Sequence, residues 1–194
     1  MNYLTPEELN SKCPYITQDE LDYMREEMSR LIEPDASVVM IGSGPGMLTF
    51  ALMDSEVSPD WNITIIDLRS TQWAYEHYKQ SKPFIAEYAE RINYITDDSY
   101  AVGIEWEDPV DLLIIDGDHT EEGVKRDMKA WLPLVGENGI VFYHDYLFEG
   151  TRWDKLGREE YPEVQPFVDE VMTTDKWEPI WRGGCSKVFR MKEI

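Results

Sequence analysis

The sequence predicts an α/β protein in which a doubly wound, mostly parallel sheet carries helices on both faces. Short apolar segments of strand length alternate with longer segments whose apolar residues recur at helical spacing. The chain of 194 residues is long enough for one domain with a proper core and too short for two ordinary domains. We therefore expect residues 1–194 to form a single domain, with residues 1–33 as an N-terminal helical extension.

The expected elements follow from periodicity and turn residues, in chain order. Residues 17–33 predict a helix, and Thr17 followed by Glu20 has the form of a capping box. Strands are expected over residues 37–41, 62–67, 92–96, 111–116 and 139–145. Helices are expected between and after them, over residues 47–55, 71–91, 121–132 and 162–175. Residues 177–192 predict a closing hairpin around Gly183 and Gly184, which completes a sheet of seven strands.

Composition restricts the partners and the compartment. The formal net charge of −21 repels phosphate backbones, so we expect no nucleic-acid substrate, although a solubilising surface is the simpler explanation of this charge. No apolar run is long enough to span a membrane, and the N-terminus lacks the features of a signal peptide. Cys13 and Cys185 are too few for a disulfide framework and fit a reducing, cytoplasmic location, although their pairing stays open.

A glycine-rich loop follows the first expected strand. Gly42, Ser43, Gly44 and Gly46 lie between this strand and the next helix, where glycines let a backbone approach a ligand closely. A nicotinamide fingerprint requires a glycine at position 47, where this chain has Met47, so a nicotinamide oxidoreductase is disfavoured. The alternative is a tight strand-to-helix turn without a ligand.

Asp67 ends the second expected strand. A carboxylate at this position can accept hydrogen bonds from both ribose hydroxyls of an adenosine. In isolation, a helix cap or a solvated acid would explain Asp67 equally well. Combined with the glycine loop, the ribose contact is favoured.

Two further acids end neighbouring strands and lie near histidines. Asp116 and Asp145 should converge at the same sheet edge as the glycine loop, and two carboxylates this close favour a bound cation. His119 lies at the mouth of the same crevice and is suited to accept a proton. His144 and Asp145 are expected on opposite faces of their strand, so a packed core histidine competes with a ligand role for His144. For His119 the alternative is a solvated residue at a helix start.

These motifs resemble those of class I S-adenosylmethionine-dependent methyltransferases. The loop GSGPG is similar to their first motif. The run IIDGDHTEEGVKRDMKAWLPLVGENGIVFYHDY resembles metal-dependent O-methyltransferases of the macrolide-sugar and cephalosporin type, a methyltransferase family 24-like group. The similarity covers roughly residues 36–190. It implies a Rossmann-like fold, S-adenosylmethionine as methyl donor, and Mg²⁺ or Mn²⁺.

The resemblance also implies roles for particular residues. It assigns cofactor binding to Gly42, Ser43, Gly44, Gly46, Asp67, Asp98, Ser99 and Asp116. It assigns the metal to Asp116 and Asp145, with His144 as a candidate further ligand, and it makes His119 the catalytic base. Two departures from the family pattern occur. Met40 replaces an acid near the methionine part of the cofactor, and Asn138 replaces the first glycine of a Gly-Gly pair.

The sequence therefore predicts an enzyme that methylates an oxygen of a small hydroxylated molecule with the help of a divalent metal. The alternatives are a metal-independent methyltransferase and an S-adenosylmethionine-binding protein without transfer activity. The methyl acceptor is not identified, although aromatic residues such as Trp73 and Tyr146 could line its pocket or simply pack. We expect no membrane partner, and the N-terminal helix could mediate a homo-oligomer.

Overall fold

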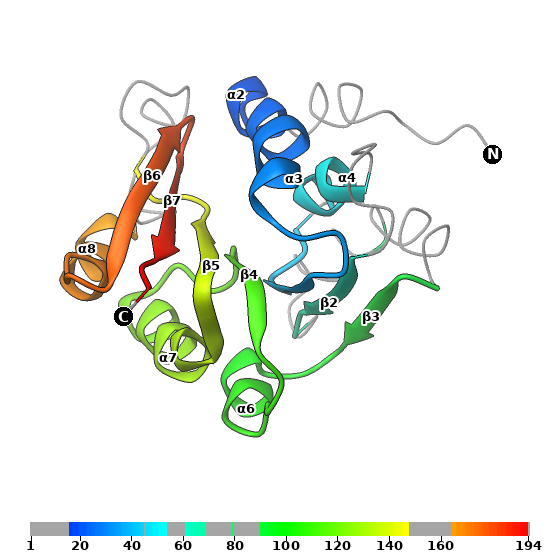
Figure 1. Cartoon of the computed structure of the whole chain (residues 1–194). Coiled ribbons are helices and arrows are strands. Elements are labelled where there is room, and N and C mark those ends of the chain that lie inside the picture. Colours follow the sequence, from blue (N-terminus) through cyan, green and yellow to red (C-terminus); the bar gives the residue numbers. More distant parts are fainter. Residues whose placement is uncertain are drawn as a thin grey trace.

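The computed structural model describes residues 16–44, 46–53, 61–68, 79, 90–147 and 164–193. These residues form a seven-stranded sheet in the order β3-β2-β1-β4-β5-β7-β6 (Figure 1). Strands β1 to β5 pair in parallel, whereas β7 is antiparallel to both β5 and β6. The predicted fold class, a doubly wound and mostly parallel seven-stranded sheet with helices on both faces, is confirmed.

The strands agree closely with the expected positions. They are β1 (Ser37–Ile41), β2 (Asn62–Ile66), β3 (Ile92–Ile95), β4 (Val110–Ile115), β5 (Val135–Tyr143), β6 (Trp177–Gly183) and β7 (Ser186–Met191). The helical elements are α2 (Gln18–Asp22), the π-helical η1 (Tyr23–Glu27), α3 (Met28–Leu31), α4 (Met47–Met53), α6 (Ser99–Ile104), α7 (Glu121–Trp131), the 3-10 turn η2 (Leu132–Leu134) and α8 (Gln165–Met172). The helix expected over 71–91 lies outside the described residues, apart from residues 79, 90 and 91.

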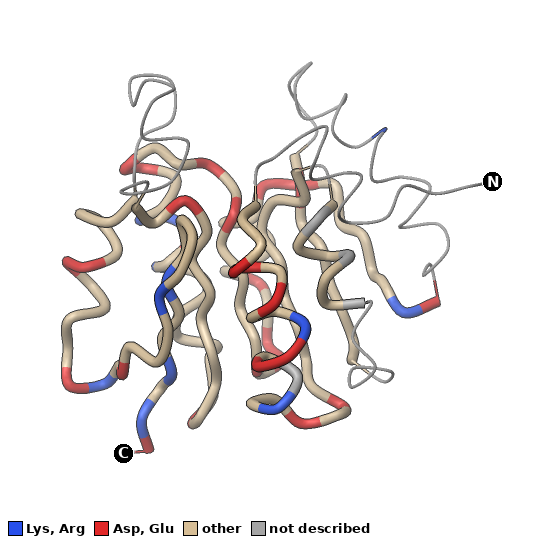
Figure 2. Tube along the Cα trace, turned by 90° about the horizontal axis from the view of Figure 1, so that it is seen from above, with Lys and Arg blue, Asp and Glu red and all other residues tan. Residues whose placement is uncertain are grey.

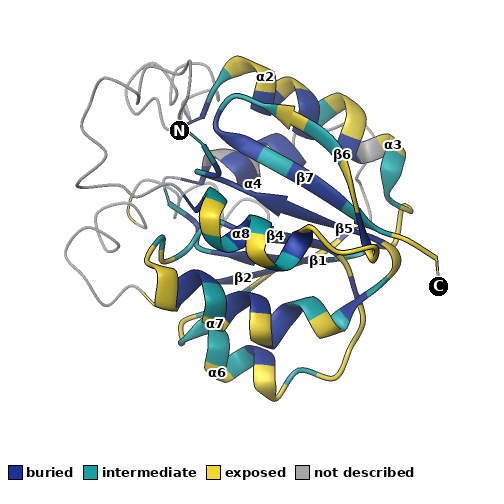
Figure 3. Ribbon diagram, turned by 90° about the vertical axis from the view of Figure 1, so that its left-hand side faces the viewer, coloured by how far each residue is buried: buried dark blue, intermediate teal, exposed yellow. Residues whose placement is uncertain are grey.

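Two hydrophobic cores lie on opposite faces of the sheet, because successive strand residues point to opposite sides. Val38 and Met40 of β1 belong to one core, and Val39 and Ile41 belong to the other. Helices α2, α3 and α4 cover the first face, and α6, α7 and α8 cover the second (Figures 1 and 3). The central strands β1, β2 and β4 are almost entirely buried between these layers, whereas the edge strand β6 is mostly exposed or half-buried (Figure 3). This burial explains the continuous apolar sequences of the central strands.

The N-terminal helix begins where the capping box predicts. Thr17 Oγ1 accepts a hydrogen bond from the Glu20 backbone N–H, and Glu20 Oε2 accepts one from the Thr17 backbone N–H at 2.7 Å. The π-helical turn η1 interrupts the helix, which the sequence did not predict. Leu21, Met24 and Met28 are fully buried in the first core, so this segment packs directly on the sheet.

Strand β5 differs from its prediction at both ends. It begins at Val135 instead of residue 139, and the pairing with β4 shifts register between Val110 and Leu112. Asn138 adopts a φ of 64° inside this irregular stretch, a conformation that asparagine tolerates. The strand ends at Tyr143 instead of residue 145, because Asp145 adopts a φ of 50°. This early end determines the arrangement of the site described below.

Acidic residues occur in helices such as α2 and in the loops between elements, while basic residues occur along β6 and β7 (Figure 2). Within the described part of the chain, no helix has the length and apolar character needed to cross a membrane. Cys185 is a buried free thiol, and Cys13 lies outside the described residues. The cytoplasmic location stays a prediction from the sequence.

Helix α6, which the sequence did not predict, packs against α7 around a buried carboxylate. Ser99 Oγ donates a hydrogen bond of 2.5 Å to Asp127 Oδ1, and the Trp131 indole N–H donates to the Ser99 carbonyl at 2.9 Å. Burial raises the pKa of Asp127 to about 6, and the negative charges of Asp98 and Asp118 add to this rise. The hydrogen bond from Ser99 and the charge of Arg126 only partly oppose it.

This buried acid predicts a pH-dependent loss of stability. The pKa of Asp127 is higher in the folded state than its usual 3.8, so stability falls as pH rises from about 4 to about 6. Asp127→Asn keeps an acceptor for Ser99 without the charge. At pH 7 we expect its free energy of unfolding, measured in urea, to exceed that of the wild type by up to about 3 kcal/mol.

The two proteins should become equally stable below about pH 3, where Asp127 is protonated in both states. The matched control is Glu122→Gln, an exposed carboxylate on the same helix, which should leave the pH dependence unchanged. Parallel stability profiles of the wild type and Asp127→Asn across this range would contradict the prediction.

Candidate functional site

Three loops meet at the carboxyl edge of the sheet because the parallel hydrogen bonding continues past the strand ends. The Gly42 N–H donates to the Ile66 carbonyl at 2.8 Å, and the Asp116 N–H donates to the Ile41 carbonyl at 2.9 Å. The His144 N–H donates to the Ile115 carbonyl at 3.1 Å. The loops after β1, β4 and β5 therefore lie side by side.

The glycines of the first loop have two different roles. A Cβ on Gly42, whose φ is 81°, would lie 2.1 Å from the Asp116 carbonyl oxygen, so only glycine lets the two loops touch. A Cβ on Gly44 would meet nothing within 4 Å. Gly44 is therefore not required by packing against the described residues, and its role in cofactor binding stays a prediction. Pro45 lies outside the described residues.

Asp67 lies beside this loop. Its Oδ2 accepts hydrogen bonds from the Ser43 backbone N–H at 3.0 Å and from Ser43 Oγ at 2.7 Å. Ser43 Oγ also contacts the Tyr94 hydroxyl at 3.1 Å, so β3 takes part in the same network. Leu68, which follows Asp67, is a large apolar side chain that is 52% exposed. The contact of Tyr94 was not predicted from the sequence, because it depends on how β3 packs beside the loop.

Asp98 and Ser99 are already engaged within the protein. Asp98 Oδ1 accepts from the Ala101 backbone N–H at 2.9 Å as the cap of α6, and it lies 3.2 Å from the Arg126 guanidinium. Ser99 Oγ donates to Asp127, as described above. Their assignment to the cofactor stays a prediction, and in this structure they orient the start of α6.

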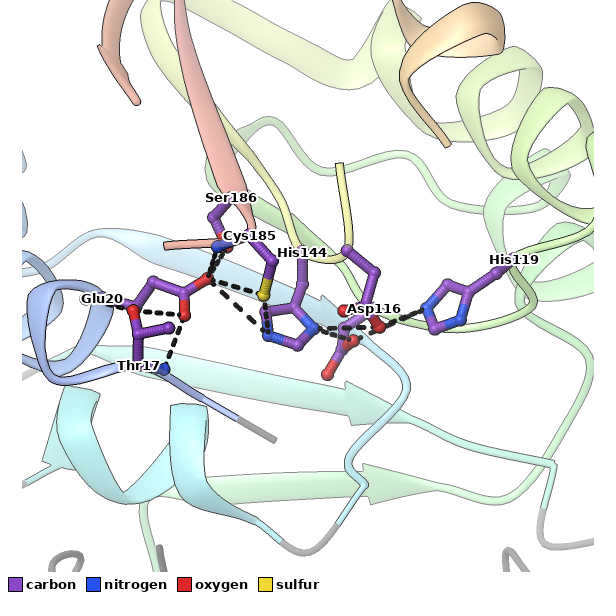
Figure 4. A network of polar contacts seen from close by, with 8 residues as sticks. Thr17, Glu20, Asp116, His119, His144, Cys185 and Ser186 are labelled. Carbon is purple, nitrogen blue, oxygen red and sulfur yellow. Dashed lines mark hydrogen bonds and ion pairs between the residues drawn. The ribbon is translucent and has the colours of Figure 1, made fainter. Parts of the chain in front are cut away.

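The second part of the site joins two carboxylates and two imidazoles (Figure 4). His144 Nδ1 lies 2.8 Å from Asp116 Oδ1 and 3.4 Å from Asp145 Oδ2. His119 Nε2 lies 3.4 Å from Asp145 Oδ2 and 3.8 Å from Asp116 Oδ1. This nitrogen is buried and has no hydrogen-bond partner. The four residues that the sequence singled out at the ends of β4 and β5 therefore form one cluster.

The expectation that His144 and Asp145 point to opposite faces was wrong. It assumed that strand alternation continues through residue 145, but β5 ends at Tyr143. The turn formed by Asp145, with its φ of 50°, brings both side chains to the same side. His144 is nonetheless only 5% exposed, as expected of a packed histidine, so it has the burial of a core residue and the contacts of a site residue.

The charges in this cluster stabilise one another. Burial alone would raise the pKa of Asp116, but His144 and His119 outweigh it and hold this pKa near about 2. Burial lowers the pKa of His144, whereas Asp116 and Asp145 raise it well above the usual value. The same two carboxylates outweigh burial at His119 and raise its pKa as well. The cluster therefore favours positive charge between its two acids, whether from protons or from a metal ion.

The donor atoms also fit a divalent metal. Asp116, His144 and Asp145 each offer a ligand atom within 4.8 Å of the others. Two ligand atoms bound about 2.1 Å from one ion lie about 3.0 Å apart at right angles, which is close to the separations found here. The buried nitrogen of His119 contacts the two carboxylates without making a hydrogen bond, which is a second observation that points to a ligand at this position.

A second polar cluster, which the sequence did not predict, lies behind His144. Its Nε2 is 3.6 Å from Cys185 Sγ and 3.8 Å from Glu20 Oε1. Glu20 comes from helix α2 and Cys185 from the turn between β6 and β7 (Figure 4). Burial raises the pKa of the Cys185 thiol to about 12, so the thiol keeps its proton at neutral pH. The sequence predicted Glu20 as a member of the capping box, but not its contact with His144.

Of the aromatic residues expected to line an acceptor pocket, Tyr146 is described and Trp73 is not. Tyr146 is buried, and its hydroxyl donates to Asp169 Oδ1 at 2.7 Å, so it packs the loop after β5 against α8. It does not line an open pocket. The acceptor pocket stays a prediction from the sequence.

Comparison with known proteins agrees with this fold. A family model described as a methyltransferase domain matches residues 39–146. Similar solved structures include a putative caffeoyl-CoA O-methyltransferase from Staphylococcus aureus, with a TM-score of 0.70, 14% identity, and coverage of 96% of this chain and 90% of that one. An O-methyltransferase from Bacillus cereus in complex with SAH has a TM-score of 0.65, 13% identity, and coverage of 97% and 89%.

A putative rRNA methylase from Clostridium thermocellum is also similar, with a TM-score of 0.65, 15% identity, and coverage of 92% of this chain and 98% of that one. The comparison with curated proteins gave no match. At these identities the solved structures establish the fold, whereas the family model covers more than half of the chain.

The chain belongs to the methyltransferase-domain family. It is an S-adenosylmethionine-dependent methyltransferase of class I, as the glycine loop and the strand-end acids predicted. This result excludes the nicotinamide oxidoreductase considered from the sequence.

The position of Asp67 predicts a specific contribution to cofactor binding. Asp67→Ala should weaken the binding of S-adenosylhomocysteine by about 1–3 kcal/mol, because a carboxylate that accepts from the ribose hydroxyls is lost. Isothermal titration calorimetry measures this change. Asp111→Ala is the matched control, since Asp111 also accepts from a backbone N–H, that of Ser37 at 2.8 Å, but lies at the opposite end of the sheet. Equal affinities of the two variants would contradict the assignment of Asp67.

Proposed function

We propose that the protein transfers the methyl group of S-adenosylmethionine to a hydroxyl oxygen of a small molecule, assisted by a divalent metal. The observation that supports this function is the cluster of Asp116, His119, His144 and Asp145 beside the glycine loop. Methyl transfer needs the acceptor oxygen in line with the sulfonium methyl group, and it needs a way to remove the hydroxyl proton. The cluster provides groups for both tasks at the correct edge of the sheet.

The proposed reaction is a displacement in one step. The acceptor oxygen forms a bond to the methyl carbon while the carbon–sulfur bond breaks, and the electron pair of that bond stays on sulfur as the neutral thioether. His119 Nε2 accepts the hydroxyl proton when its ring is neutral, and because Asp116 and Asp145 raise its pKa, this neutral form needs a higher pH than in a free histidine. A divalent ion, when bound, would stabilise negative charge on the acceptor oxygen. Asp116 and Asp145 would hold that ion beside His119.

His119 is a better candidate for the base than His144. The side chain of His119 is 21% exposed and its Nε2 makes no hydrogen bond, so this ring is less enclosed than that of His144 and its nitrogen is not already engaged in a hydrogen bond. The side chain of His144 is 5% exposed, and polar groups face both of its ring nitrogens. His144 is therefore suited to a ligand or structural role.

The donor set favours Mn²⁺ over Mg²⁺ among the two ions that the sequence suggested. Mg²⁺ prefers oxygen ligands and retains most of its water, whereas imidazole nitrogen suits first-row transition metals. The imidazole of His144 in the candidate ligand set therefore makes Mn²⁺ the better probe in binding experiments.

The net charge of −21 supports a small acceptor over a nucleic acid. A similar fold occurs in a putative rRNA methylase, so fold alone does not choose between these acceptors. The negative net charge would repel an RNA backbone, and acidic positions are spread along the described trace (Figure 2). A screen of hydroxylated small molecules with radiolabelled methyl donor, with rRNA as the competing substrate, tests this choice. Methylation of rRNA alone would refute the small-molecule proposal.

Metal dependence gives the second test. Mn²⁺ should raise the melting temperature of the wild type by mass action, and EDTA should remove this effect and the activity. Asp145→Asn should weaken Mn²⁺ binding by about 10²-fold or more, because even the loss of an outer-shell partner costs about 10–100-fold. S-adenosylhomocysteine binding should stay nearly unchanged and serves as the control. Full activity in EDTA would favour a metal-independent enzyme, in which His144 alone neutralises the two acids.

The role of His119 gives a third test. His119→Ala should lower the turnover number by about 10²–10⁴-fold, since general-base catalysis contributes a factor of this size. The Kd for S-adenosylhomocysteine should not change. His119→Gln, which keeps a polar side chain of similar length without a basic nitrogen, should be equally slow. Nearly normal turnover in both variants would move the proton-accepting role to solvent.

A further inference from the structure

His144 is held between acceptor atoms on both sides of its ring. Nδ1 faces the carboxylates of Asp116 and Asp145, and Nε2 faces Cys185 and Glu20 (Figure 4). A neutral imidazole carries one N–H, so one of its nitrogens donates and the other presents a lone pair. The side of the ring that takes the proton therefore determines whether His144 can bind a cation beside Asp116.

Glu20 determines the direction of the hydrogen bonds behind the ring. It is fully buried, and its Oε2 accepts from the Thr17 backbone N–H and from Thr17 Oγ1, each at 2.7 Å. Its Oε1 accepts from the Cys185 backbone N–H and from Cys185 Sγ, each at 3.2 Å, and from Ser186 Oγ. A carboxylate surrounded by donors acts only as an acceptor, so the Cys185 S–H must point toward Glu20.

This direction has a consequence for His144. Because the thiol proton points to Glu20, the sulfur lone pairs are left to accept a hydrogen bond from His144 Nε2, 3.6 Å away. In the resulting series of hydrogen bonds, His144 Nε2–H donates to Cys185 Sγ, and the Cys185 thiol donates to Glu20. This series places an N–H on Nε2. Nδ1 lies 2.8 Å from the Asp116 carboxylate, which only accepts, so without a metal Nδ1 carries an N–H as well, and a cation bound beside Asp116 and Asp145 would replace the proton on Nδ1 alone.

We propose that Glu20 and Cys185 are positioning residues of the active site, which fix the tautomer and orientation of His144 so that Nδ1 faces the metal-binding carboxylates. Helix α2, which lies outside the residues matched by the methyltransferase family model, thereby becomes part of the active site. The contribution to catalysis rests on the proposed metal-assisted function, whereas the hydrogen-bond chain can be tested without cofactor or substrate. Histidine ligands of metals commonly donate their second ring N–H to a partner in this way.

A glycine in the β6–β7 turn allows this turn to contact the start of helix α2. Gly184 has a φ of 56°, and a Cβ there would lie 2.2 Å from Thr17 Oγ1 and 2.6 Å from Glu20 Cδ. Only glycine therefore lets the turn approach the start of α2. The Cys185 carbonyl also accepts from the Tyr146 N–H at 2.6 Å, which connects the turn to the segment that carries His144 and Asp145.

Glu20, His144 and Cys185 also have the donor types of a metal site, and their ligand atoms lie within 4.8 Å of one another. A second ion here would have to displace hydrogen bonds, because the two oxygens of Glu20 already accept from five donors. The hydrogen-bond chain explains this cluster without an ion.

The experiment compares Cys185→Ala, which removes the link, with Cys185→Ser, whose hydroxyl can donate to Glu20 and accept from His144. Ser186→Ala is the matched control, because it removes a neighbouring donor to Glu20 and does not touch His144. Histidine-ring ¹H–¹⁵N spectra of the full chain, with and without diamagnetic Mg²⁺, report which nitrogen of His144 carries the proton. Calorimetry with Mn²⁺ reports metal affinity.

In the wild type and Ser186→Ala we expect a His144 proton on Nε2, protected from exchange with water. In Cys185→Ala this proton should exchange faster or divide between the two nitrogens, and the Kd for Mn²⁺ should rise about 10–100-fold. Cys185→Ser should restore both properties to within a few-fold of the wild type. A wild-type ring with its proton only on Nδ1 would overturn the proposal, as would a folded Cys185→Ala protein with an unchanged ring spectrum.

If the wild type binds no Mn²⁺, the proposed metal-assisted function fails, but the ring spectra still decide whether Glu20 and Cys185 fix the tautomer. If Mn²⁺ binds and the ring spectra of Cys185→Ala match those of the wild type, the metal proposal stands and the positioning role fails. Circular dichroism of each variant establishes that it is folded before either comparison.

Discussion

The arrangement of the site depends on the imidazole of His144. This residue directly follows β5, the strand that joins the parallel part of the sheet to the antiparallel strand β7. On one side it contacts the acids that follow β4 and β5, and on the other it contacts α2 and the β6–β7 turn. A buried polar ring between acidic groups is stable only when each nitrogen has a partner. This requirement holds together segments that are separated by more than a hundred residues in the sequence, from Glu20 to Cys185.

The parallel sheet supplies the other constraint. The hydrogen bonds between β2, β1, β4 and β5 continue for one residue beyond the strands, so the loops that follow them begin at the same level. Gly42 then allows the first loop to touch the backbone of Asp116, where any side chain would collide. The glycine loop therefore serves the packing of this edge of the sheet, in addition to the cofactor binding predicted for it. This packing explains why the glycine loop and the acid–histidine cluster lie beside each other.

Much of this could be predicted from the sequence, because the patterns involved are local. Continuous apolar strands alternating with helical periodicity determine a parallel sheet, and acids directly after strands must lie at its carboxyl edge. The capping box at Thr17 and the hairpin around Gly183 were also readable from neighbouring residues. Features that depend on tertiary packing could not be predicted from the sequence. Helix α6 is short and depends on contacts of Ser99 and Gly103 with α7.

The sequence by itself determined the fold class, the family and the four residues at the ends of β4 and β5. It did so because helical and strand periodicity and motif spacing are properties of the chain alone. Only the tertiary structure decided how those residues face one another. Strand β5 ends two residues earlier than its apolar pattern suggests, and the turn at Asp145 brings His144 and Asp145 to the same side. Glu20 and Cys185 join the site only because helix α2 and the β6–β7 turn pack together over Gly184, a contact between distant segments that no local pattern encodes.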